Sequence, residues 1–246
     1  MSLELFSAEE HQKLVDAERR YGNAFVNAYN TTILLSNLMM WPVIDCDIFI
    51  RFYSQMKKYH TLSVVSTVRL HRIQAKMDLR YFLESTANAA FSLAHTDTQN
   101  YFDLQNSRIG DAQKATLKAY RWLETTYPGH STFLKEIKTE INEQTAHAHV
   151  INSQHNFDFV PGQRAEIITS YFDFEDEELV KLDLWLGAKA GLHAIDLILR
   201  VQKDFGGFLP SRDVDDLPQL MADNDAVFRE FQRSPSFEQP FGQRCD

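Results

Sequence analysis

The segment "RLHRIQAKMDLRYFLES", residues 69–85, spaces its charged side chains as one face of a helix would. At about 100° per residue, Arg69, Arg72, Lys76, Arg80 and Glu84 fall within one sector of a helix. We call the four cations of this set the cation stripe. Guanidinium and ammonium groups in such a row are the chemistry that holds phosphate or another anionic ligand. The same row can instead form salt bridges that join this helix to its neighbours.

Apolar residues inside the same sector favour salt bridges. Ile73 and Leu83 lie beside the cations, so the stripe faces other helices rather than open solvent. Because burial of an unpaired charge is costly, we expect Arg80 to pair with Glu84, one turn later, and to be more than half buried. Breaking such a buried pair by Arg80→Ala would cost about 3–5 kcal/mol. The alternative, an anionic ligand on the stripe, stays open.

A second chemical pattern lies in "EINEQTAHAHV", residues 140–150. Glu143 and His147 stand at i and i+4, where a carboxylate and an imidazole meet and can transfer protons. The di-iron pattern Glu-x-x-His, the zinc pattern HExxH and any Cys–His ligand spacing are all absent from the sequence. We therefore predict no metal and no cofactor.

The segment from 176 to 205 carries a polar side with Lys189, His193, Asp196 and Arg200. An outer, solvated face explains this pattern. If the face instead meets a partner helix, His193 and Asp196 are its candidate binding pair. On the same segment, "GAKAG" places Gly187 and Gly191 one turn apart, which predicts a close crossing with another helix.

The elements that must position these residues are mostly helices. Low glycine and proline content, 9 and 7 residues of 246, argues against a many-turned β fold. Period-two alternation on both sides of Pro161–Gly162 predicts antiparallel strands at 157–160 and 166–172. We expect a mainly α helical bundle with one β-hairpin at about 157–172, in a single helical domain 1–246 with an extended tail at about 234–246. The expected helices cover residues 7–40, 45–58, 61–95, 111–127, 131–149, 177–205 and 215–232.

Charge and composition narrow the possible partners and locations. The formal net charge of -9 makes nucleic acid an improbable partner for the whole surface. The uncharged segment 21–44 is interrupted by asparagines and is too short in its apolar part for a membrane span. The N-terminus lacks the apolar region of a signal peptide. Cys46 and Cys245 are far apart in the sequence and form neither a CxxC nor a zinc spacing. We therefore expect no membrane association, reduced thiols and a cytoplasmic location.

The segments "LRYFLES" and "INEQTAHAHV" resemble a pattern in uncharacterised bacterial all-helical proteins, where an Arg-x-x-x-Glu helix precedes an Asn/Ser…His helix. The resemblance covers about a third of the chain and points to Arg80, Glu84, Asn142 and His147. Some of these proteins are similar to HEPN domains, nucleotide-binding bundles of toxin systems that carry Arg followed four to six residues later by His. No arginine of this chain has a histidine at that spacing, which puts a HEPN-type ribonuclease activity in doubt.

Two functions follow as hypotheses. The first is a helical binding or assembly module, most simply a homodimer, because a lone hairpin and a tail carrying Phe237 and Phe241 need cover. The second is a hydrolase or nuclease-like enzyme whose catalytic residues are Arg80, Glu84 and His147. The candidate binding residues in either case are Arg69, Arg72, Lys76, Asn142, His193 and Asp196.

Overall fold

The computed structural model describes residues 2–43, 46–101, 110–145, 156–160 and 166–233. Within them lie eight α-helices and two short antiparallel ribbons, which confirms the mainly α bundle with a hairpin. The expected tail, 234–246, lies outside the described residues. The helices are α1 (Leu3–Val15), α2 (Ala17–Ser36), α3 (Asp47–Val68), α4 (Arg72–Ala94), α5 (Gly110–Thr126), α6 (Pro128–Thr145), α8 (Glu177–Phe205) and α9 (Leu217–Gln232), with short 3-10 turns η1 (Thr98–Asn100) and η2 (Arg212–Asp216).

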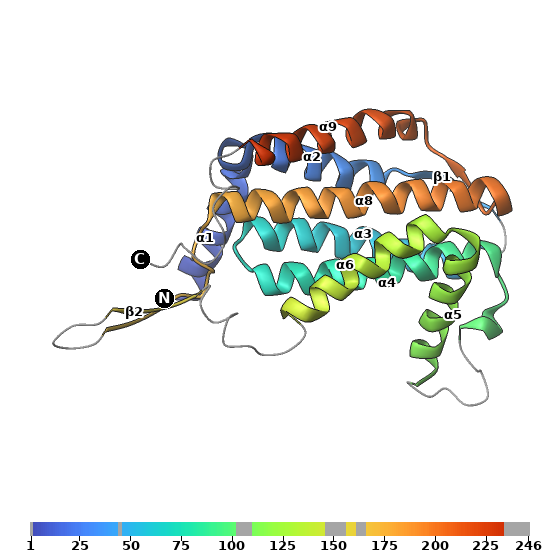
Figure 1. Ribbon diagram of the computed structural model, residues 1–246, viewed down its shortest axis with the longest axis horizontal. Helices are drawn as coiled ribbons and strands as arrows, with labels where there is room; N and C mark the ends of the chain where they lie inside the picture. Colours follow the sequence, from blue (N-terminus) through green and yellow to red (C-terminus); the bar gives the residue numbers. More distant parts are fainter. Residues whose placement is uncertain (1, 44–45, 102–109, 146–155, 161–165, 234–246) are drawn as a thin grey trace.

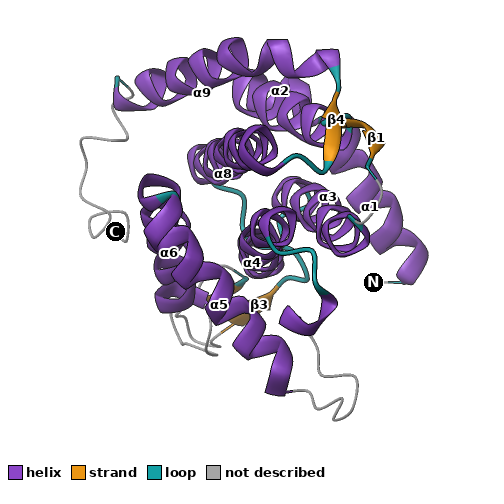
Figure 2. Cartoon of the chain, turned by 90° about the vertical axis from the view of Figure 1, so that its right-hand side faces the viewer, coloured by secondary structure: helices purple, strands orange, loops and turns teal. Residues whose placement is uncertain are grey.

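Helix α8 lies in the middle of the bundle (Figures 1 and 2). It contacts α2 and α9 on one side and α3, α4 and α6 on the other. Its sequence explains this place: Leu192, Ile195 and Ile198 are at most 2% exposed. Asp176 caps its start through hydrogen bonds to the amides of Glu178 and Leu179. The helix therefore begins and ends within a residue of the sequence prediction.

The first expected helix, 7–40, is in fact two helices and a bend. Helix α1 begins at Leu3, and α2 changes direction at Gly22, whose φ of 50° and ψ of -132° are not helical. Figure 1 shows α1 running across the end of the bundle and α2 running along it. Only glycine adopts this backbone region without strain, so Gly22 fixes the corner between the two directions.

Helices α2, α3 and α8 meet at the buried side chain of His60, which is 0% exposed. Its Nε2 lies 3.1 Å from the Gly187 carbonyl, and its Nδ1 lies 3.0 Å from Thr32 Oγ1. Because a carbonyl only accepts, Nε2 carries the proton and Nδ1 accepts from the hydroxyl. A Cβ at Gly191 would lie 2.5 Å from both His60 Nε2 and Thr31 Cγ2. The predicted close crossing is therefore confirmed at Gly191, whereas nothing lies within 4 Å of a Cβ at Gly187.

The boundary between α3 and α4 differs from the sequence prediction. We expected a break near 58–61, but α3 continues to Val68. The chain turns at Leu70, which has a left-handed φ of 61°, and the His71 amide donates to the Ser66 carbonyl to close the helix. Leucine gives no sequence signal for a conformation that glycine usually supplies. The break therefore falls inside the cation stripe, between Arg69 and Arg72.

Two ribbons complete the described structure. Strands β2 (Phe157–Val160) and β3 (Glu166–Thr169) pair antiparallel, as predicted, with Phe159 opposite Ile167. The second strand ends at Thr169 rather than 172, because Phe172 turns inward and is 5% exposed. The turn at 161–162 lies outside the described residues. An unpredicted ribbon pairs β1 (Met39–Pro42) with β4 (Phe208–Pro210), two segments far apart in sequence.

Helix α2 accounts for most of the uncharged segment 21–44. Ala24, Ala28 and Leu35 of this helix are at most 4% exposed, so its apolar side faces the bundle. Within the described residues, no helix combines the length and apolarity that crossing a membrane would need.

Replacing Gly22 by alanine should destabilise the protein by about 1–3 kcal/mol, because any side chain is strained at this φ and ψ. No atom lies within 4 Å of a Cβ at Gly22, so the cost would come from the backbone alone. Urea unfolding measures it, with Gly129→Ala on α6 as the control, where a Cβ also meets nothing and φ is not positive. Equal free energies of unfolding for the two variants would contradict a bend at Gly22 that only glycine adopts without strain.

The stability of the protein should depend on pH through His60. Burial lowers the pKa of His60 to about 4, from an ordinary value of 6.5. Between pH 4 and 6.5 the unfolded chain therefore binds a proton that the folded chain does not. The contribution is full above pH 6.5 and decreases as the pH falls towards 4.

Unfolding free energies at pH 7.5 and 4.5, for the wild type and His60→Gln, test this expectation. Glutamine keeps one donor and one acceptor but does not titrate. The wild type should lose about 2–3 kcal/mol more than the variant over this interval. Parallel pH profiles would show that His60 is protonated in the folded state as readily as in the unfolded one.

Candidate functional site

The cation stripe does not lie on one helix. Helix α4 begins at Arg72, so Arg69 belongs to the turn that ends α3. Its Nη1 lies 3.8 Å from Glu10 Oε1 on α1, and His71 Nε2 lies 3.1 Å from the same oxygen. The expectation that Arg69 shares a helical face with Arg72 is wrong, because the left-handed Leu70 separates them.

Arg72 forms the most buried ion pair of the stripe. Its Nε donates to Asp183 Oδ2 on α8 at 2.8 Å, and the two side chains are only 12% and 14% exposed. Its backbone amide donates to Asp173 Oδ2 at 2.7 Å, in the segment after β3. Arg72 thus attaches the start of α4 to α8 and to the base of the hairpin.

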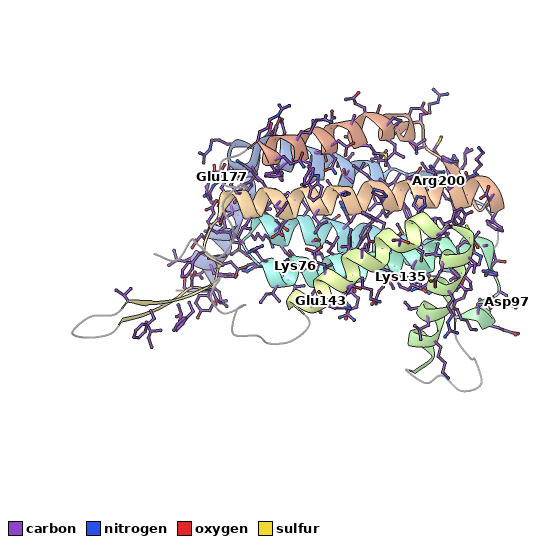
Figure 3. All side chains as sticks on the ribbon, viewed as in Figure 1. Lys76, Asp97, Lys135, Glu143, Glu177 and Arg200 are labelled. Carbon is purple, nitrogen blue, oxygen red and sulfur yellow. The ribbon has the colours of Figure 1, made fainter. Side chains whose placement is uncertain are left out.

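Lys76 lies one turn further along α4 (Figure 3). Burial lowers the pKa of its ammonium group, and Arg72 lowers it further, while Asp183 and Glu140 raise it. The surroundings of Lys76 therefore contain acids from both α8 and α6 as well as the neighbouring arginine. The ammonium group of Lys76 therefore interacts with charged side chains of its own chain.

Arg80 pairs with Glu84, as predicted. Its Nε lies 3.6 Å from Glu84 Oε1, and its side chain is 33% exposed, so it is more than half buried. Lys138 of α6 makes the shorter contact to the same oxygen, at 2.8 Å. Glu84 is therefore the acid that links α4 to α6, and Arg80 is its more distant partner. This geometry lowers the expected cost of losing Arg80.

The rest of the proposed catalytic set cannot be assembled from described residues. His147 lies outside them, so its convergence with Arg80 and Glu84 stays a prediction. Asn142 lies on α6, one turn after Lys138, and its buried Oδ1 has no hydrogen-bond partner in the described part of the chain. The role of Asn142 as a binding residue also stays a prediction.

A second charged cluster lies near the other end of the bundle, where Figure 3 labels Arg200. Asp196 Oδ2 accepts from His130 Nε2 and from Arg200 Nε, each at 2.8 Å. His193 makes no hydrogen bond to Asp196 but stacks on Phe133, with ring centroids 3.9 Å apart. Sequence reasoning missed His130, because it comes from α6, 66 residues away, and nothing local marks it.

Burial and the neighbouring cations both lower the pKa of His193, whereas they shift the pKa of Asp196 in opposite directions. Burial lowers the pKa of His193, and His130 and Lys189 lower it further. Burial would raise the pKa of Asp196, but hydrogen bonds from Arg200 and His130 bring it below its ordinary value of 3.8. Asp196 and His130 form a hydrogen-bonded carboxylate–imidazole pair, which is the kind of pair that general acid–base catalysis uses. No group of three described His, Cys, Asp or Glu residues has the geometry of a metal site.

Neither cluster opens into the described hollows. Three hollows of about 420, 270 and 350 Å³ lie along α2 and α9, and none is lined by the cation stripe or by His130, His193 or Asp196. The two clusters join helices, and the hollows lie elsewhere. The asparagines of α2 that line them were noted in the sequence only as interruptions of an apolar segment.

Arg72→Ala should destabilise the protein by about 3–5 kcal/mol, because it removes the guanidinium that lies 2.8 Å from the largely buried Asp183. Arg80→Ala should cost less than about 1 kcal/mol, since Lys138 keeps Glu84 paired and the site is partly exposed. Urea unfolding of both variants tests the order of the two effects. A larger loss of unfolding free energy for Arg80→Ala than for Arg72→Ala would contradict this ranking of the two arginines.

Comparison with known proteins finds no family model that matches the chain, no similar curated protein and no similar solved structure. Its function therefore has to be inferred from its own fold and side chains.

Proposed function

We propose that the protein is a helical assembly module that forms a homodimer through the hairpin β2–β3. The observation that carries this proposal is an apolar ribbon face left uncovered by the bundle. Phe157, Phe159 and Ile167 are 40%, 53% and 65% exposed. Residues directly opposite in an antiparallel pair lie on one face, so the register places Phe159 and Ile167 together, with Phe157 beside them.

The ribbon extends away from the helices (Figure 1). A two-stranded ribbon is marginally stable alone in water, and each strand has one edge without a partner strand among the described residues. A stable hairpin of this kind needs a surface that covers its apolar face. In the described structure the bundle does not supply that surface.

A second copy of the chain supplies it most simply. Five large apolar side chains on this face and at the base of the ribbon are 40–73% exposed: Phe157, Phe159, Ile167, Tyr171 and Phe174. At 150–250 Å² for a buried aromatic residue, they offer roughly 500 Å² per chain. Two copies would bury about 1,000 Å², the area that a specific interface has to reach. A two-fold axis lets each ribbon cover the other with identical residues.

The proposal also includes a cytoplasmic location and a binding function without catalysis. Cys46 is buried, and its thiol donates to the Val43 carbonyl at 2.8 Å, which fits a reduced sulfur and a reducing compartment. The alternative, a hydrolase or nuclease-like enzyme using Arg80, Glu84 and His147, has less support. Glu84 pairs with Arg80 within α4 and with Lys138 of α6, and the acidic net charge disfavours nucleic acid. An anionic ligand on the cation stripe would have to compete with the carboxylates of Asp183 and Glu84 for Arg72 and Arg80.

The double variant Phe159→Thr with Ile167→Thr should convert a dimer into a monomer. Threonine retains a high strand propensity, so the ribbon keeps its local preference while its apolar face is lost. Light scattering at micromolar concentration measures the mass, and far-UV circular dichroism verifies the helices. Leu117→Thr is the control, because Leu117 is 51% exposed and belongs to α5, which lies at the opposite end of the bundle from the ribbon (Figure 1).

A wild-type monomer at micromolar concentration would end the homodimer proposal. A dimer that survives the double variant unchanged would place the interface elsewhere. Loss of the dimer with Leu117→Thr as well would indicate a general effect of exposed apolar residues rather than a specific ribbon contact.

A further inference from the structure

The ribbon β1–β4 presents large apolar side chains on its outer face. Trp41 and Leu209 are partners in the register, so they lie on the same face, and they are 68% and 54% exposed. Val43, two residues after Trp41, is 56% exposed. On the inner face, Phe208 is 2% exposed and stacks on Phe49. One face of this ribbon thus packs on the core, and the other is left uncovered by the described chain.

A hollow of about 350 Å³ adjoins this ribbon. Its apolar part is formed by Ile33 and Leu34 of α2 and Leu220 of α9, and Ile33 is 43% exposed. The Ser211 amide donates to the Leu38 carbonyl, which holds the turn η2 against the end of α2. Because β1 follows α2 and η2 follows β4 within three residues, the hollow lies next to the ribbon. We call the outer face of β1–β4 together with this hollow the end surface.

The rim of the hollow is acidic. Asp213 and Asp216 line it, and both side chains are exposed. The turn η2 to which they belong also carries Asp215, against a single cation, Arg212. Among the residues that the structure describes, none of these four side chains takes part in an ion pair. An apolar surface bordered by unpaired carboxylates is complementary to a partner that combines apolar groups with cations.

The ribbon has no edge open to a further strand. The Val43 amide donates to the Gly207 carbonyl, so the backbone groups of the next pair, Pro42 and Phe208, point to the outer edges. Pro42 has no N–H to donate, and the Phe208 carbonyl already accepts from Gln202 Nε2 at 3.0 Å. A partner therefore has to bind through side chains. A helix suits this, because it satisfies its own backbone hydrogen bonds.

We propose that the end surface binds a basic amphipathic helix of another protein. Apolar side chains of that helix contact Trp41 and Leu209 and enter the hollow, while its Lys or Arg side chains meet Asp213 and Asp216. A second copy of this chain fits less well, because a two-fold contact would bring the same carboxylates together. The end surface lies at the opposite end of the bundle from β2–β3, so the proposal does not rest on the homodimer (Figures 1 and 2).

Fluorescence anisotropy of a labelled synthetic peptide, an amphipathic helix of leucine and lysine, tests the proposal with the full chain at physiological ionic strength. The peptide should bind saturably at micromolar protein. The same peptide with glutamate in place of lysine should not bind. Trp41→Thr should weaken binding at least tenfold, and so should the double variant Asp213→Asn with Asp216→Asn. All three positions are exposed, and far-UV circular dichroism verifies that the helices are intact.

Two matched controls separate this surface from general attraction to an acidic protein. Leu117→Thr removes an exposed apolar side chain from α5, and Asp225→Asn with Glu230→Gln removes two exposed carboxylates from α9 that do not line the hollow. Each should change the affinity less than twofold. Losses equal to those of the end-surface variants, or no saturable binding at high micromolar protein, would overturn the proposal.

The other possible occupants of the end surface give different results. Loss of a dimer with Trp41→Thr in light scattering would assign the surface to a second copy. Sedimentation of the protein with phosphatidylcholine vesicles, lost with Trp41→Thr, would assign it to a lipid surface. Either result would overturn the proposal. The variant Phe159→Thr with Ile167→Thr should bind the peptide as tightly as the wild type, so the homodimer and the end surface are tested separately.

Discussion

The bundle depends on the close crossing at His60. A neutral imidazole donates to the Gly187 carbonyl of α8 and accepts from Thr32 of α2, and Gly191 leaves the space for it. A buried imidazole with both nitrogens hydrogen-bonded specifies the relative position of three helices, whereas apolar packing alone tolerates several. Phe82 of α4 touches the same ring edge-on, with centroids 5.1 Å apart. Three helices around α8, namely α2, α3 and α4, are thereby registered to it at one point.

Charged side chains then attach the outer elements to this frame. Arg72 joins α4 to α8 and to the base of the hairpin, while Glu84 joins α4 to α6 through Lys138. His130 and Asp196 join α6 to α8 near the other end. These pairs explain why an acidic protein concentrates cations on α4: Arg72 and Lys76 lie near acids of α8 and α6, and Arg69, just before α4, meets Glu10 of α1. The hairpin strands themselves receive no such attachment in the described structure, and their apolar face stays open to a second chain.

Local signals in the sequence predicted the elements better than their meeting points. Acidic residues at the start of α8 and Gly206–Gly207 at its end marked that helix within a residue, and alternation around Pro161–Gly162 marked the ribbon. Leu70 and Gly22 determine where the chain turns, but a left-handed leucine has no sequence signature and an isolated glycine has many uses. His130 with Asp196, and β1 with β4, are pairings across 66 and more than 160 residues. Such contacts follow from packing, which a single sequence does not display.

Hydrogen–deuterium exchange at the β2 and β3 amides, compared between nanomolar and high-micromolar protein, tests the central claim most directly. Amides on the outer edges of a free ribbon exchange quickly at every concentration. If the ribbon forms the dimer interface, its amides should become protected as the concentration rises, while amides in the middle of α8 keep the same protection throughout. Fast ribbon exchange that does not change with concentration, in a protein whose mass is that of a dimer, would contradict the account.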